Sequence, residues 1–129
     1  MKILFRKTCV VAVLVAGCPL VNAKEYLPPN MAFKPVLSGN IITINIAEGY
    51  YLYQNKILLQ KQKKDVEFKF MNKSLQKNFP QFGTYSVYLD KVQLKIAPDV
   101  KPPLTIRFQG CSAEGLCYPP QQVTLTSIK

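Results

Sequence analysis

The sequence predicts an all-β protein with an immunoglobulin-like antiparallel β-sandwich fold, and three observations lead to this prediction. Apolar and polar residues alternate with a period of two in one segment after another. These segments recur at roughly ten-residue spacing and are separated by Gly, Pro and Asn, which is typical of sandwiches and barrels. No window of about twelve residues carries a convincing apolar stripe at helical spacing. About seven short strands in roughly 100 residues favour the immunoglobulin-like sandwich.

The first predicted strands follow an irregular, proline-rich lead-in over residues 24–35. Residues 41–46 are rich in β-branched side chains and place their apolar residues on one face. Glu48-Gly49 is predicted to form a turn, because glycine adopts turn conformations readily. Residues 50–59 form the next predicted strand, with a bend at Gln54-Asn55.

The second half of the chain continues the same pattern. Residues 65–70 alternate, with one valine and two phenylalanines on one side. Residues 71–79 are predicted to form one short turn of helix. The remaining strands are predicted over residues 85–89, 92–96, 104–108 and 123–128. No internal repeat, low-complexity segment or second domain interrupts this succession.

The first 23 residues have the layout of a secretory signal peptide. Three basic residues precede a short apolar run, and the segment ends in the small-residue site Val21-Asn22-Ala23. The apolar run is much shorter than the roughly 20 residues that span a bilayer. We therefore expect cleavage after Ala23, export, and one mature domain over residues 24–129.

A lipoprotein signal that ends at residue 17 is the alternative interpretation of the same segment. Residues 14–18 resemble a bacterial lipobox, in which Cys18 would be lipidated and become the mature N-terminus. Both interpretations predict export. No later stretch is apolar enough to cross a membrane, so a lipid at Cys18 would be the only membrane attachment.

The chain is strongly basic, with a formal net charge of +10 at pH 7. The predicted leader holds three of the 17 basic residues and none of the seven acidic ones, which leaves +7 for the mature domain. An exported protein rarely meets nucleic acid, so we expect no nucleic-acid partner. The cluster of Lys61, Lys63 and Lys64 is best explained as a solvated strand edge or turn, where lysine discourages aggregation. An acidic partner surface or anionic lipid headgroups are the alternatives.

The residue types that the sequence lacks exclude several kinds of catalytic and metal-binding site. The chain has no histidine, which excludes Ser-His-Asp and Cys-His catalysis and histidine-ligated metal sites. Cys9 and Cys18 fall in the predicted leader, which leaves Cys111 and Cys117 as the mature thiols. Two thiolates cannot complete a tetrahedral zinc site. We therefore expect no metal and no cofactor, and thiol chemistry is the chemistry that remains.

The loop from Cys111 to Cys117 has a structural and a redox interpretation. A disulfide that closes seven residues would stabilise the fold by about 2.4 kcal/mol, at the low end of the usual range. Such staples are common in exported domains. A short surface loop also suits a disulfide that is opened and remade, because exposed disulfides are the labile ones. Gly115 can supply the positive φ that so tight a loop requires. The residues alone leave both interpretations open, since the usual Cys-x-x-Cys motif is absent.

Two segments carry a resemblance to a known family. FQGCSAEGLCYPP, residues 108–120, resembles the active-site loop of the N-terminal periplasmic domain of the thiol:disulfide interchange protein DsbD, which has the pattern Gln-Gly-Cys-x5-Cys-Tyr-Pro-Pro. GYYLY, residues 49–53, resembles a second segment of that family. The resemblance extends over residues 24–129 and implies an immunoglobulin-like sandwich.

The resemblance implies a protein-disulfide reductase module in the periplasm. Such a module receives electrons from a thioredoxin-like domain supplied by a membrane-embedded transporter. It passes them to periplasmic thioredoxin-fold proteins, such as the disulfide isomerase DsbC and the thioredoxin of cytochrome c maturation. A binding or structural sandwich with a staple disulfide is the alternative function.

The resemblance also assigns roles by position. Cys117 would attack the partner's disulfide, and Cys111 would resolve the mixed disulfide. Tyr51 and Tyr53 fall on the family's active-site tyrosines, although packing within the sandwich or on its surface explains them equally well.

A cap loop tipped by a phenylalanine shields the disulfide in the family, and two acidic residues precede that phenylalanine. Residues 78–83 correspond to this loop once a one-residue gap is allowed. Phe82 is the candidate cap, with Phe79 behind it, and a buried core role for Phe82 is the alternative. Pro80-Gln81 stands in place of the acidic pair, so a copy that binds the same partners without turnover is a further alternative. DsbD proper continues beyond this domain, which leaves a free-standing shuttle and a fragment both open.

Overall fold

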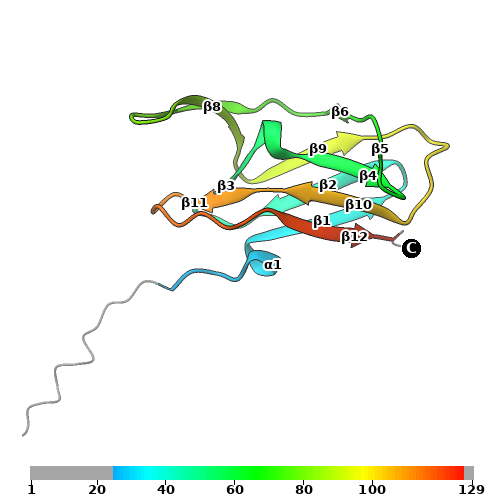
Figure 1. The fold of residues 1–129 in the computed structure, drawn as a ribbon, viewed down its shortest axis with the longest axis horizontal. Coiled ribbons are helices and arrows are strands. Elements are labelled where there is room, and N and C mark those ends of the chain that lie inside the picture. Colours follow the sequence, from blue (N-terminus) through cyan, green and yellow to red (C-terminus); the bar gives the residue numbers. More distant parts are fainter. Residues whose placement is uncertain (1–24, 127–129) are drawn as a thin grey trace, which may run out of the picture.

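Three antiparallel sheets of four strands each make up the part of the protein that the computed structural model describes, residues 25–126 (Figure 1). The predicted signal peptide over residues 1–23 and the lipidation candidate Cys18 lie outside the described residues, as do residues 127–129 of the predicted domain. No helix within residues 25–126 is long and apolar enough to cross a membrane.

The three sheets share no strand. The first has the order β1 (Phe33–Ser38), β2 (Ile41–Ile46), β9 (Lys91–Lys95), β6 (Lys69–Phe70). The second has the order β12 (Gln121–Leu125), β10 (Leu104–Phe108), β4 (Leu58–Lys61), β5 (Lys64–Asp65). The third has the order β11 (Gly110–Ser112), β3 (Tyr50–Tyr53), β8 (Gly83–Tyr88), β7 (Leu75–Phe79). Two short helices complete the described chain, α1 (Pro29–Ala32) and η4 (Gln54–Lys56).

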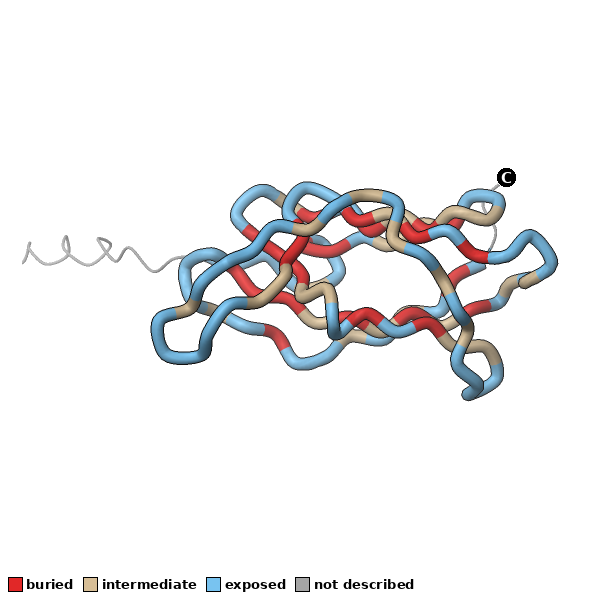
Figure 2. The backbone as a smooth tube through the Cα atoms, turned by 90° about the horizontal axis from the view of Figure 1, so that it is seen from above, coloured by how far each residue is buried: buried red, intermediate tan, exposed pale blue. Residues whose placement is uncertain are grey.

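The main core lies between the first and second sheets, and Figure 2 shows their buried residues in the interior of the molecule. In β2, Ile42 and Ile44 are completely buried and Ile46 nearly so, which confirms the predicted apolar face of residues 41–46. In β10, the apolar residues alternate with half-buried polar ones in the same way. Burial of each such side chain contributes about 1.5–3 kcal/mol. This packing is an immunoglobulin-like β-sandwich, as the alternation predicts.

The third sheet lies at one end of the sandwich (Figure 1). The chain enters it through β3 and leaves through η4 into β4 of the second sheet. The predicted strand over residues 50–59 is therefore two strands, and the predicted bend at Gln54-Asn55 is confirmed as η4. This bend lets β3 separate from the main sandwich and carry its tyrosines to the end of the molecule.

Three local predictions are wrong, and they concern the irregular lead-in over residues 24–35, the single strand over residues 65–70 and the helical turn within residues 71–79. The lead-in over residues 24–35 is not irregular throughout, because α1 and the start of β1 lie within it. Pro35 is accommodated in β1 because β1 is an edge strand, where a missing N–H costs no ladder bond. Residues 65–70 are not one strand, because the chain passes there from β5 in the second sheet to β6 in the first.

Residues 71–79 were predicted to include a helical turn, but residues 75–79 form β7 instead. This strand pairs with β8 over five positions in a hairpin. Its side chains are mostly exposed, so the segment lacks the apolar alternation that predicts a strand.

The Lys61–Lys64 segment lies where the sequence predicts a turn and a strand edge. Lys61 and Lys64 are paired across β4 and β5, and Gln62 and Lys63 between them adopt positive φ. β5 is an outer strand of its sheet. Charged side chains at such an edge discourage pairing with another sheet.

Candidate active site

A disulfide joins Cys111 and Cys117 at the end of the molecule that carries the third sheet. The S–S distance is 2.07 Å and the two Cα atoms are 4.0 Å apart. Cys111 belongs to β11, where it is the register partner of Tyr51 in β3. The disulfide is therefore attached directly to the strand that holds the tyrosine segment.

Backbone hydrogen bonds close the disulfide loop on itself. The Ser112 N–H donates to the Leu116 carbonyl over 2.7 Å, and the Tyr118 N–H donates to the Gly110 carbonyl over 3.0 Å. Gly115 has a φ of +111°, which confirms the positive φ predicted for this position. The loop is thus a tight hairpin whose two cysteines face each other across a β-bridge.

The two sulfur-bearing residues differ sharply in exposure. Cys111 is completely buried, whereas Cys117 is exposed. The difference follows from the strand pairing, because β11 is covered by β3 while Cys117 follows the loop at the surface. A partner sulfur can therefore approach Cys117 but not Cys111 without movement of the chain.

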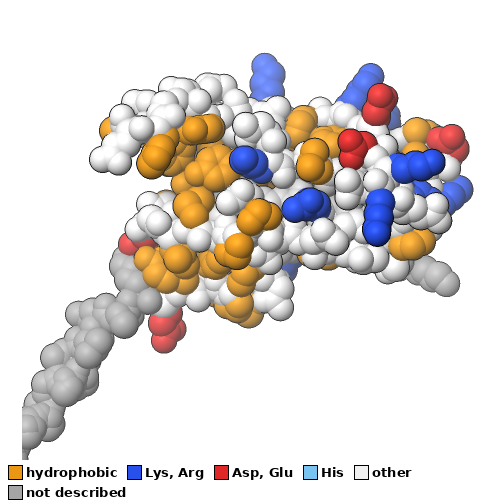
Figure 3. All heavy atoms as spheres, in the orientation of Figure 1, with side chains coloured by type: hydrophobic (Ala, Val, Ile, Leu, Met, Phe, Trp, Pro, Cys, Tyr) orange, Lys and Arg blue, Asp and Glu red, His pale blue; other side chains and the backbone are white. Residues whose placement is uncertain are grey.

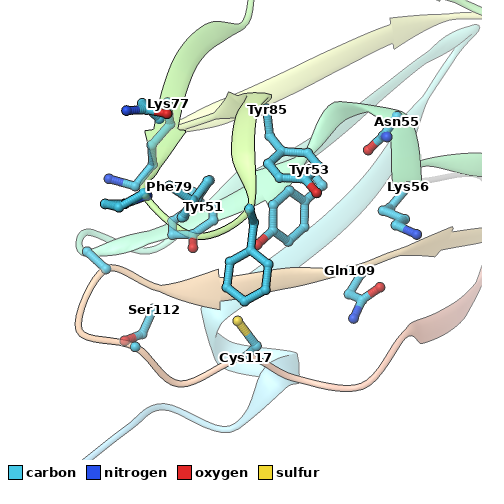
Figure 4. A pocket seen from close by; sticks show the side chains of 15 residues that line it. Tyr51, Tyr53, Asn55, Lys56, Lys77, Phe79, Tyr85, Gln109, Ser112 and Cys117 are labelled. Atoms are coloured by element: carbon cyan, nitrogen blue, oxygen red, sulfur yellow. The ribbon is translucent and has the colours of Figure 1, made fainter.

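An aromatic wall faces the disulfide from the third sheet. Its four rings come from β3, β7 and β8 and stack edge-to-face or tilted, with centroids 5.6–6.3 Å apart. They belong to Tyr51, Tyr53, Phe79 and Tyr85. Tyr51, Val87 and Cys111 form a buried cluster of their own, separate from the main core, with Tyr53, Phe79 and Tyr85 packed against it. Figure 4 shows the four rings above the Cys117 sulfur. Tyr51 and Tyr53 therefore pack outside the main core.

The wall also contacts the disulfide through a hydroxyl group. The Tyr53 oxygen lies 3.5 Å from Cys111 Sγ. A disulfide sulfur carries no proton, so the hydroxyl is the donor in this contact. Burial, together with a hydrogen bond to Tyr53, raises the pKa of Tyr51 far above its ordinary value. Tyr51 is therefore a neutral phenol at physiological pH.

Phe82 lies at the tip of the hairpin formed by β7 and β8. Its side chain is 72% exposed, so the alternative of a buried core role is wrong. The Phe82 N–H donates to the Phe79 carbonyl over 2.9 Å, which closes the turn over Pro80-Gln81. Phe82, Phe79 and Cys117 line one pocket of about 720 Å³. The structure thus brings the predicted cap residue to the same pocket as the exposed cysteine.

A second aromatic group supports the loop from the core side. Tyr118, directly after Cys117, packs against Phe33 and Tyr50 with centroids 5.8 and 6.2 Å away. The Tyr118 hydroxyl donates to the Leu27 carbonyl, and the Leu27 N–H donates to the Tyr50 hydroxyl. Burial, and then the hydrogen bond to Tyr50, raises the pKa of Tyr118 to about 12. These contacts fix the backbone position next to Cys117.

The sequence reasoning missed two components of the site. Tyr85 was placed on a strand without a role, and Lys77 fell in the predicted helical turn. In the structure the two residues are register partners across the hairpin of β7 and β8. Recognition of residues 75–79 as a strand paired with β8 would have placed both beside Tyr51 and Tyr53.

Comparison with known proteins assigns the chain to a family. Residues 23–128 match the family model of the thiol:disulfide interchange protein DsbD, N-terminal. The chain belongs to this family of redox-protein domains. The matched range includes the Cys111–Cys117 loop.

Curated relatives in the family are longer proteins. The chain is 34% identical over 124 residues to the thiol:disulfide interchange protein DsbD of Neisseria meningitidis serogroup A, which covers 87% of the chain and 21% of that protein. It is 42% identical over 86 residues to DsbD of Haemophilus ducreyi, which covers 62% of the chain and 14% of that protein. The chain thus spans about a fifth or less of the length of these relatives.

Two solved structures are similar to this one. The reduced DsbD N-terminal domain of Neisseria meningitidis has a TM-score of 0.63 at 32% identity, over 76% of this chain and 86% of that one. The complex between the DsbD N-terminal and the PilB N-terminal domains from Neisseria meningitidis gives a TM-score of 0.60 at 31% identity, over 81% of this chain and 89% of that one.

Proposed function

We propose that this domain is a periplasmic thiol:disulfide exchange module that relays two electrons through Cys117 and Cys111. The observation that carries the proposal is the pairing of an exposed Cys117 with a completely buried Cys111 beside an aromatic pocket. Exchange requires one accessible sulfur and one sulfur held close behind it. Membership in the DsbD N-terminal family supports the same reaction class.

In the proposed reaction the reduced domain reduces a partner disulfide. The Cys117 thiolate attacks one sulfur of the partner, so a mixed disulfide forms and the partner's other sulfur leaves as a thiolate. The Cys111 thiolate then attacks Cys117 Sγ and expels the partner's first sulfur. Two electrons have passed to the partner, and the Cys111–Cys117 disulfide is restored.

The aromatic wall is proposed to assist the second step. Tyr53 already donates to Cys111 Sγ, and a hydrogen bond to a thiolate favours the charged form. The neutral Tyr51 ring and the Phe82 side chain line the pocket beside Cys117 and give it apolar surface. These roles make Cys117 and Cys111 the catalytic residues, and Tyr51, Tyr53 and Phe82 supporting ones.

The proposed partners are proteins. A thioredoxin-like domain of a membrane electron transporter is the donor, and periplasmic thioredoxin-fold proteins, such as a DsbC-like isomerase or the thioredoxin of cytochrome c maturation, are the acceptors. The complex of the similar Neisseria domain with a PilB domain supports a protein as the acceptor. Lipidation of Cys18 stays a prediction, which labelling of the full chain with a radioactive lipid precursor tests.

Trapping of the mixed disulfide tests the proposal. In Cys111→Ser the resolving sulfur is gone, so Cys117 is expected to hold a thioredoxin-fold partner in a covalent complex on a non-reducing gel. The matched variant Cys117→Ser leaves only the buried sulfur and is expected to trap none. A staple disulfide predicts a modest loss of stability in both variants and trapping in neither, and that result would overturn the proposal.

A further inference from the structure

Two lysines border the pocket beside the disulfide. Lys56 ends η4 and Lys77 lies in β7, and both side chains are exposed. Among the described residues that line this pocket, none is acidic. Glu114 belongs to the disulfide loop but does not line the pocket. In the view of Figure 4, Lys77 and Lys56 lie on opposite sides of the Cys117 sulfur.

Lys77 is held at the pocket by the aromatic wall. Its Nζ lies 5.6 Å from the centroid of the Phe79 ring and 5.9 Å from that of Tyr51. A cation–π contact contributes about 0.5–1 kcal/mol at an exposed site. The ammonium group is therefore kept next to the rings that face the disulfide.

Within residues 25–126, neither lysine is neutralised by an acidic side chain. In the part of the chain that the structure describes, no carboxylate forms an ion pair with Lys56 or Lys77. Two unpaired positive charges at the edges of an apolar pocket attract negatively charged groups and repel positive ones. Charge complementarity of this kind raises association rates and suppresses wrong partners.

The shape of the site favours a protein segment as the occupant. The pocket of about 720 Å³ has an apolar wall of four rings, which a carboxylate alone would not fill. Figure 3 shows apolar side chains gathered at this end of the molecule, with acidic side chains at its lower edge, whereas lysines and further acidic residues are spread over the remainder of the visible face. A disulfide with its neighbouring residues matches an apolar centre between two cationic edges.

We propose that Lys56 and Lys77 are specificity residues that select protein partners with carboxylates on both sides of the reactive disulfide. The inference rests on the proposed exchange function and names the chemistry of its partner. The aromatic wall receives the partner's disulfide, and the two ammonium groups pair with Asp or Glu side chains that flank it.

Cyclic disulfide peptides test this proposal. Three peptides have the same sequence except that the residues flanking the disulfide are Asp, Gln or Lys. Second-order rate constants for their reaction with the reduced protein are measured at about 0.05 and 0.5 M salt, where screening differs strongly. The ratio of the Asp rate to the Lys rate is the readout, because any effect of the lysines on the Cys117 thiol pKa cancels in that ratio.

We expect the Asp peptide to react about tenfold faster than the Lys peptide at low salt, with the ratio falling to about twofold at high salt. The double variant Lys56→Gln with Lys77→Gln lowers the low-salt ratio to about twofold. The matched double control Lys69→Gln with Lys95→Gln removes an equal charge from β6 and β9 in the first sheet and leaves the ratio unchanged. Thermal unfolding of all variants checks that each is folded.

Two results would overturn the specificity proposal. One is equal reaction of the native protein with all three peptides. The other is an equal drop of the ratio in Lys69→Gln with Lys95→Gln, which would assign the preference to net charge instead of to Lys56 and Lys77. Absence of reaction with every peptide is a different outcome, because it contradicts the exchange function itself.

Discussion

Gly110 is the glycine, among those in residues 25–126, at which an added Cβ atom would meet other atoms. A Cβ atom at this position would lie 2.4 Å from the Tyr51 carbonyl oxygen, 2.6 Å from the Phe33 ring and 2.8 Å from a Leu52 methyl group. The carbonyl belongs to the backbone of β3 and cannot rotate away. Phe33 is 1% exposed and is enclosed by other aromatic rings. Gly110→Ala therefore forces β11 away from β3.

Overpacking of this kind costs about 1–3 kcal/mol, and a contact with backbone places Gly110→Ala near the upper end, at about 3 kcal/mol. The matched control is Gly39→Ala, where φ is +62° and no atom lies within 4 Å of the added Cβ. A left-handed alanine there costs about 1 kcal/mol. Urea unfolding of the oxidised proteins measures the loss of stability in both variants, and the expected m-value is about 1.5 kcal/mol/M.

The midpoint is expected to fall by about 2 M urea in Gly110→Ala and by about 0.7 M in Gly39→Ala. Because Gly110 precedes Cys111, the same variant is expected to make the disulfide more accessible to dithiothreitol. Equal midpoints for the two variants would refute the close approach of β11 and β3, and with it the reason why Cys111 is buried.

Three further predictions concern the wall, the cap and the loop support. Phe82→Ala changes the free energy of unfolding by less than about 0.5 kcal/mol, because the side chain is 72% exposed. The same variant speeds reduction of the Cys111–Cys117 disulfide by dithiothreitol, because Phe82 lines the pocket beside Cys117. Tyr53→Phe lowers the free energy of unfolding by about 1 kcal/mol. It also lengthens the lifetime of the mixed disulfide in rapid-quench experiments, because Cys111 loses its hydrogen-bond donor. The raised pKa of Tyr118, about 12, means that the folded state keeps a proton that the unfolded state loses near pH 10. The contribution of Tyr118 to the free energy of unfolding is therefore constant below about pH 9.5 and falls from pH 10 to 12, and Tyr118→Phe removes this contribution in urea titrations.

The described strands that the sequence predicted well are those whose faces differ in burial. Residues 41–46 and 104–108 alternate because one face of each strand enters the main core. β7 has no such contrast, since its residues are exposed or half-buried, and only its pairing with β8 makes it a strand. β1 is not predicted from the sequence because it contains Pro35, and a proline argues against a strand unless the strand is known to lie at an edge of its sheet.

The candidate site was predictable in composition but not in arrangement. The cysteine spacing and the tyrosine segment could be found by inspection, because each is local in sequence. The contrast between buried Cys111 and exposed Cys117 could not, because it depends on the pairing of β11 with β3 some 60 residues earlier in the chain. The position of Lys77 depends in the same way on the hairpin register that sets it opposite Tyr85.

The equilibrium reduction potential of the Cys111–Cys117 disulfide tests the central claim most directly. It is measured by thiol trapping of the protein across a series of glutathione or dithiothreitol buffers. An exchange module predicts a value above about −270 mV, within the range of known exchange catalysts. A value below about −300 mV would place the bond among structural disulfides and would contradict the proposed relay.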